Sequence, residues 1–116
     1  MANEFEDKIK EVQAKHPTLT QFGFGGTGEI RLDAVNLCTE WLLKHDGLDR
    51  RKTINPNSCS YTLKHVVERV MGQYVANGEF ICAALVLGYK MTKPKNSPNV
   101  YFNIRKLKEH EYYAVR

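Results

Sequence analysis

The segment LKHVVERVMGQYVANGEFICAALVLGYKM, residues 63–91, contains the clearest structural signals in this chain. Its first part repeats apolar residues at helical spacing and stops at Gly72, which predicts a helix over 60–72. Asn77 suits the N-cap of a second helix, over 77–87, because an Asn side chain accepts hydrogen bonds from the free N–H groups of a first helical turn. This second helix is apolar around most of its circumference, so we expect it to be largely buried.

Periodicity and turn residues predict the other elements on either side of this stretch. In chain order, they are a helix over 2–16, a short strand or extended linker at 18–22, an irregular glycine-rich loop at 23–28, a helix over 29–45 with Thr27 as its N-cap, a polar connector at 49–58 with a very short strand at 52–54, a turn at 73–76, a strand at 89–92, a basic loop at 93–98, a strand at 99–105 and a tail at 106–116. The last two strands are expected to form a hairpin. We therefore expect a single domain over 1–116 with an α+β fold that is mainly helical and has a C-terminal β-hairpin.

Residues 29–105 read, in order, helix, short strand, helix, turn, helix, strand, basic loop, strand, and this order resembles a winged helix-turn-helix domain. The stretch 63–91 carries the resemblance, since it would supply the positioning helix, the turn, the second helix and the start of the wing. The resemblance implies a winged-helix-like core that contacts DNA through its wing and through the N-terminus of its second helix. Because only Asn77 and Glu79 offer polar side chains near that start, we expect phosphate contacts rather than direct reading of base edges.

Charge is divided between the two halves of the chain. Residues 1–49 hold five Lys/Arg and nine Asp/Glu, a net charge of −4, whereas residues 50–116 hold twelve and four, a net charge of +8. A basic half in a folded domain favours a polyanionic partner, held by phosphate contacts that weaken with salt. The expected nucleic-acid contacts are Arg50, Arg51, Lys52, Asn77, Lys90, Lys93, Lys95, Arg105 and Lys106. The alternative is that these are solvated loop charges without a ligand.

Two functions from different classes stay open. The first is a non-enzymatic nucleic-acid-binding module, with duplex DNA as the favoured partner. The second is a protein-binding inhibitor or adaptor that docks on an acidic protein surface. The segments SYTLKH and YVANGEFICAALVLGY, residues 60–65 and 74–89, resemble small uncharacterised proteins of bacteria and their phages or mobile elements, which implies action on a host defence complex. The sequence predicts no cofactor, no metal site, no membrane segment and a cytoplasmic location, and it leaves the oligomeric state open.

A glycine pattern gives a third and least favoured function. Gly23, Gly25 and Gly28 fit G-x-G-x-x-G, a pattern that holds phosphate where it follows a strand and opens a helix. The chain is too short for a dinucleotide-binding fold, so a plain surface loop is the favoured interpretation and a small phosphate-handling enzyme the alternative.

Two groups of residues have both a packing and a chemical interpretation. Tyr89, Tyr101 and Phe102 lie in or beside the expected hairpin, where they either stack on unpaired bases or pack against the helices. Cys38 and Cys82 fall on apolar helical faces, so we expect them to be core residues rather than reactive thiols.

Overall fold

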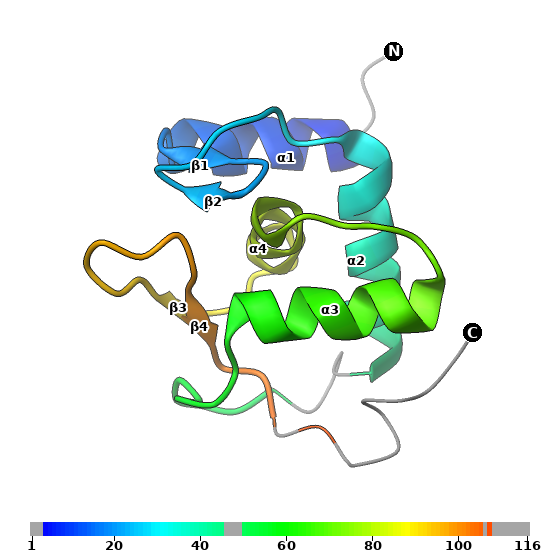
Figure 1. The fold of residues 1–116 in the computed structure, drawn as a ribbon, viewed down its shortest axis with the longest axis vertical. Coiled ribbons are helices and arrows are strands. Elements are labelled where there is room, and N and C mark those ends of the chain that lie inside the picture. The colour runs from blue at the N-terminus through cyan, green and yellow to red at the C-terminus, as the bar shows by residue number, and fades with distance from the viewer. Residues whose placement is uncertain (1–3, 46–49, 106, 108–116) are drawn as a thin grey trace.

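Helix α4 (Asn77–Val86) lies at the centre of the fold, and the other elements surround it (Figure 1). The computed structural model describes residues 4–45, 50–105 and 107. The surrounding elements are α1 (Glu4–Lys15), β1 (Leu19–Thr20), β2 (Gly23–Phe24), α2 (Leu32–His45), α3 (Ser60–Met71), β3 (Met91–Thr92) and β4 (Tyr101–Phe102). Within the described residues the chain is α+β, with four helices and two small antiparallel strand pairs, and the expected fold class is confirmed at that level.

The composition of α4 explains its central position. Residues 80–84 have no exposed surface. The Phe80 ring contacts two other fully buried rings, with centroids 6.2 Å away at Trp41 of α2 and 5.9 Å away at Phe102 of β4. A helix that is apolar on all sides is stabilised when other elements cover it, and α1, α2, α3 and the β1–β2 pair all contact α4. The expectation that this helix is largely buried is confirmed.

The ends of α3 and α4 follow their sequence signals in part. Helix α3 ends at Gly72, whose left-handed φ of 71° lets its N–H donate to Glu68 O at 2.9 Å, as predicted. The prediction of Asn77 as an N-cap is wrong, because Asn77 is the first helical residue and Ala76 occupies the N-cap. Ala has no side-chain oxygen that could accept from the first helical turn. The other half of a capping box is present, since the Glu79 carboxylate accepts a hydrogen bond from the Ala76 N–H at 3.0 Å.

Helix α2 begins at Leu32, later than predicted, and Thr27 is not its N-cap. Residues before the helix are held in the preceding loop by backbone hydrogen bonds. The Gln21 N–H donates to Gly28 O at 3.2 Å, and the Phe22 N–H donates to Thr27 O at 3.3 Å. The chain therefore cannot turn into the helix until it has left this loop.

Part of the glycine-rich segment is a strand. In the β1–β2 pair, Leu19 lies opposite Phe24 and Thr20 lies opposite Gly23. The prediction of an irregular loop over all of 23–28 is therefore wrong at its first two residues, because pairing with β1 supplies the hydrogen bonds that fix them.

The β3–β4 pair confirms the predicted C-terminal hairpin, with Met91 opposite Phe102. Each strand has two residues and is shorter than predicted. The predicted tail at 106–116 lies outside the described residues, except for Leu107, which is buried.

The strand predicted at 52–54 does not form, and the bridge between the connector and the hairpin lies at Cys59 instead. Cys59 forms an isolated antiparallel bridge with Tyr101 of β4. Residues 52–54 lie between two single backbone contacts to a distant segment, since the Arg51 N–H donates to Asn103 O at 2.9 Å and the Asn55 N–H donates to Phe102 O at 2.8 Å. These contacts hold the connector there without a strand ladder, and a turn from Asn55 to Ser58 precedes the bridge.

Candidate nucleic-acid interface

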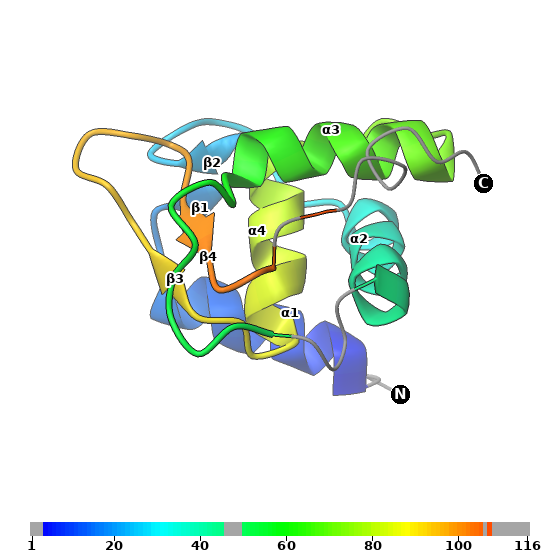
Figure 2. The ribbon, with the colours of Figure 1, turned by 90° about the horizontal axis from the view of Figure 1, so that it is seen from below.

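The connector and the C-terminal hairpin form an end of the molecule that carries positive charge. Segments 50–60 and 88–105 together contain seven Lys/Arg and no Asp/Glu. Both lie on the side of the molecule away from α2, next to each other in the two ribbon views (Figure 1, Figure 2). We call these two segments the basic end. By contrast, α1 carries charges of both signs, with four acidic residues and three lysines.

The buried residue Asn103 joins the two segments of the basic end. Its N–H donates to Lys90 O at 3.2 Å, and its Oδ1 accepts from the Lys90 N–H at 2.9 Å. Its backbone carbonyl accepts from the Arg51 N–H, and its Nδ2 donates to Arg51 O, both at 2.9 Å. The exposed residues Arg51, Lys52 and Lys90 therefore lie together, and Lys90 Nζ also donates to Lys52 O at 3.4 Å. No sequence pattern indicated Asn103, because it connects backbones that are far apart in the chain.

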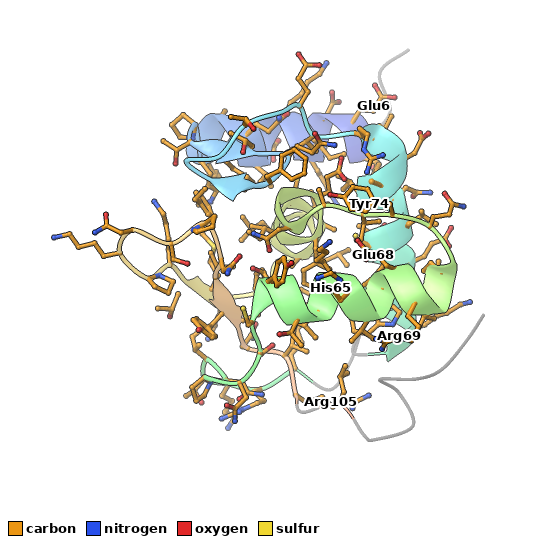
Figure 3. All side chains as sticks on the ribbon, viewed as in Figure 1. Glu6, His65, Glu68, Arg69, Tyr74 and Arg105 are labelled. Carbon is orange, nitrogen blue, oxygen red and sulfur yellow. The ribbon has the colours of Figure 1, made fainter. Side chains whose placement is uncertain are left out.

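Arg50 differs from its neighbours, because it braces the connector. Its guanidinium carbon lies 3.9 Å from the centroid of the Tyr89 ring, and its Nη2 donates to Leu87 O at 2.8 Å. These contacts hold the connector against the C-terminal end of α4, so the geometry favours Arg50 less than Arg51 as a phosphate contact. Arg105 is half-buried and lies below α3 in Figure 3, and Lys106 is outside the described residues.

Lys93 and Lys95 are exposed on the hairpin loop, 93–98. The Lys93 Nζ lies 4.8 Å from the centroid of the Phe24 ring. The other end of the loop is anchored, since the Phe24 N–H donates to Pro98 O at 3.1 Å. The hairpin loop thus packs against the β1–β2 pair while both of its lysines stay at the surface.

Asn77, the predicted nucleic-acid contact at the start of α4, is buried and links three segments by hydrogen bonds. It is only 5% exposed, and its Nδ2 donates to Asn99 Oδ1 at 2.9 Å, to Pro98 O at 3.2 Å and to Phe22 O at 3.4 Å. These bonds tie α4 to both hairpins. Since residues 77–84 are all buried, α4 offers little free surface to a DNA groove, and the geometry does not support a contact through this helix.

The start of α2, where the glycine pattern would place a phosphate, is already bound by a carboxylate. Glu79 is fully buried, and its Oε2 accepts from the Arg31 backbone N–H at 2.7 Å. The Arg31 guanidinium donates from Nε and Nη2 to the same carboxylate, at 2.9 and 2.8 Å, and these hydrogen bonds raise the pKa of Arg31. The amides of Gly25 and Gly26 are also used, since they donate to carbonyls within their own hairpin. The geometry therefore does not support a phosphate-handling enzyme at this loop.

An aromatic pocket, which sequence reasoning missed, lies beside the hairpin loop. Its volume is about 430 Å³, and it is lined by Phe22, Tyr61, Lys64, Tyr74, Asn77, Pro98 and Asn99. Phe22, Tyr61 and Tyr74 are 46%, 50% and 51% exposed, whereas Tyr89 and Phe102, which had a stacking interpretation, are buried. The three exposed rings come from the β1–β2 turn, α3 and the α3–α4 turn, so only the fold brings them together.

No protein-family model matches this chain, and searches of curated proteins and of solved structures find no match. In residues 4–45, 50–105 and 107, no group of three or more His, Cys, Asp or Glu is placed to hold a metal ion. None of the helices described there has the length and apolar character that a membrane crossing requires.

Proposed function

We propose that this chain is a non-enzymatic module that binds nucleic acid by gripping the phosphate backbone with its basic end. The observation that carries the proposal is the gathering of Arg51, Lys52 and Lys90 around Asn103, in two segments without a carboxylate. Such a cluster attracts a phosphate chain by its field and is stabilised on binding by the release of counterions.

The proposed binding mode differs from that of a winged helix-turn-helix domain in the role of its second helix. The hairpin loop with Lys93 and Lys95 acts as the wing, whereas α4 serves as a core helix and reads no bases. Contacts to phosphate carry little sequence information, so we expect weak dependence on base sequence. We also propose a cytoplasmic location, as the sequence predicts.

Charge reversal at the basic end tests the proposal. We expect Lys93→Glu with Lys95→Glu, and separately Arg51→Glu with Lys52→Glu, to weaken binding of a labelled oligonucleotide by roughly tenfold or more at low salt, because each pair removes phosphate contacts. Fluorescence anisotropy measures the affinity.

The matched control is Lys8→Glu with Lys10→Glu, which makes the same change in net charge on α1, a helix outside the basic end. Both side chains are exposed. We expect this control to bind almost as tightly as the unmodified chain. An equal loss of affinity in all three variants would show that net charge matters and the basic end does not.

The same basic end also fits an acidic protein surface, which is the alternative function: an inhibitor or adaptor from a phage or mobile element. A pull-down after nuclease treatment separates the two. A partner that survives nuclease and is lost in the Arg51→Glu, Lys52→Glu variant favours the protein-binding function.

A further inference from the structure

The aromatic pocket has a feature that phosphate binding does not explain: two of its exposed rings contact a buried ammonium group. The Lys64 side chain is only 7% exposed. Its Nζ lies 5.4 Å from the centroid of the Tyr61 ring and 4.9 Å from that of the Tyr74 ring. Its Nζ also donates to Glu68 Oε1 at 2.7 Å. Lys64 is therefore held in the wall of the pocket by contacts within the protein.

Both tyrosine rings are oriented before any ligand arrives. His65 meets the Tyr61 ring edge to face, with centroids 4.6 Å apart and an angle of 87° between the planes. On the other side, the Arg31 guanidinium carbon lies 5.4 Å from the centroid of the Tyr74 ring, and its Nη2 donates to Tyr74 O at 3.4 Å. Figure 3 shows His65 and Glu68 on the side of α3 that faces Tyr74. Rings that are fixed and still half exposed lose little entropy when they bind a partner.

The charges around the pocket narrow the class of ligand. A cationic ligand is disfavoured, because the Lys64 ammonium already occupies the position between the two tyrosine rings. A small anion gains little from Lys64, since Glu68 neutralises that charge at 2.7 Å. The lining that remains is aromatic, and the volume of about 430 Å³ lies within the roughly 300–1,000 Å³ of small-ligand sites. A neutral, flat ring fits this environment best.

We propose that the aromatic pocket seats an unpaired nucleobase, so that the partner of this chain is a single-stranded nucleic acid rather than a duplex. The inference rests on the proposed function and names its ligand more closely. The pocket is lined by Pro98, the last residue of the hairpin loop that carries Lys93 and Lys95, and by Asn99, which follows it. A single strand whose phosphates contact those lysines lies along the same loop as the pocket, where its bases are free to stack. Stacking on an aromatic ring accepts any base, in keeping with weak sequence preference.

The main competitor for an aromatic pocket is a proline-rich peptide, which also packs on exposed tyrosines. Charge favours the nucleic acid, because segments 50–60 and 88–105 carry seven Lys/Arg without a carboxylate. A proline-rich segment carries no phosphate and gains nothing from these cations. A single ligand can occupy both the pocket and the basic end only if it carries flat rings and negative charge.

An abasic strand isolates the contribution of the pocket. It keeps the phosphates of a normal single strand and lacks the rings. We expect the normal strand to bind the unmodified protein roughly 5- to 150-fold more tightly than an abasic strand of equal length, which is the effect of stacking one base. We expect Tyr61→Ala with Tyr74→Ala to remove this difference, and Tyr61→Phe with Tyr74→Phe to keep it, because Phe retains the ring. Circular dichroism confirms that each variant is folded.

The outcomes separate the base site from the proposed function. Equal affinity for normal and abasic strands, with no effect of the Tyr→Ala changes, overturns the base site and leaves phosphate binding intact. Failure to bind any strand at low salt overturns the proposed function itself. Binding of a polyproline peptide that is lost in the Tyr→Ala variant, without binding of a single strand, overturns both. If the Tyr→Ala variant is unfolded, the comparison of normal with abasic strands on the unmodified protein still decides whether a base is bound.

Discussion

Four donors converge on the carboxylate of Glu79: the backbone N–H groups of Arg31 and Ala76, and the Nε and Nη2 of the Arg31 guanidinium. Glu79 has no exposed surface, whereas the Arg31 side chain is 47% exposed. The carboxylate thus joins the start of α2 to the start of α4. It satisfies two backbone amides that would otherwise be left without a partner at those helix starts.

We expect Glu79→Gln to lower the free energy of unfolding by about 3 kcal/mol, because it removes the charge that holds a partly buried ion pair and several hydrogen bonds. Urea denaturation measures this loss. Asp33→Asn, on an exposed residue of the first turn of α2, is the control and should change the stability by about 0.5 kcal/mol or less. A Glu79→Gln variant as stable as the control would contradict the structural role of this carboxylate.

The reactivity of each cysteine depends on the burial of its own thiol. Burial raises the pKa of Cys82 to about 12 and that of Cys38 further still. Both thiols are therefore protonated at neutral and mildly basic pH, and the thiolate is the reactive form. Cys59 is partly exposed at the start of α3.

We expect a thiol reagent at mildly basic pH to modify Cys59 in the folded protein and to reach Cys38 and Cys82 only after unfolding. Mass spectrometry of the labelled protein gives the sites. In a Cys59→Ser variant the fast reaction should disappear. Fast labelling of either buried cysteine would show that α2 and α4 separate readily.

At the scale of elements, the contact between the β1–β2 turn and α4 explains a glycine inside a helix. A Cβ added to Gly78 would overlap the Thr20 carbonyl oxygen, and the Gly78 N–H donates to Gln21 O at 2.8 Å. Ala normally stabilises a helix relative to Gly by about 0.5–1 kcal/mol, so the packing reverses the usual sign here.

We expect Gly78→Ala to lower the stability by about 1–3 kcal/mol, since an added methyl group in a packed site forces the neighbours apart. Gly25→Ala is the matched comparison, because its Cβ meets open space and only its φ of 73° is unfavourable. That variant should cost about 1 kcal/mol. Thermal unfolding of both variants tests the packing, and a Gly78→Ala variant that melts above the unmodified protein would refute it.

The sequence predicted elements well where their signals are local. The apolar repeat and the glycine stop fixed α3, and the apolar circumference of α4 indicated its burial. The predicted start of α2 and the predicted strand in the connector were wrong, because contacts between distant segments decide both features. The Arg31 N–H is hydrogen-bonded to Glu79, and Cys59 forms a β-bridge with Tyr101. The residues next to each partner in the sequence do not indicate either contact.

At the scale of the whole molecule, the fold shows which basic residues lie together, whereas the sequence shows only how many there are. The sequence identified the basic residues of the second half of the chain, but it gave no reason to place Arg51 and Lys52 beside Lys90. Asn103 supplies that reason. The aromatic pocket was missed for the same cause, since Phe22, Tyr61 and Tyr74 belong to three separate segments.

The dependence of binding on salt shows whether the basic end holds phosphates. The affinity of the unmodified protein for a labelled single strand is measured by fluorescence anisotropy over a series of salt concentrations. The logarithm of the association constant should fall linearly with the logarithm of the salt concentration, with a slope of roughly −0.7 for each phosphate contact. The slope should be shallower in the Lys93→Glu, Lys95→Glu variant and unchanged in the Lys8→Glu, Lys10→Glu control. A flat salt dependence, or no binding even at low salt, would show that the basic end does not bind nucleic acid through its phosphates.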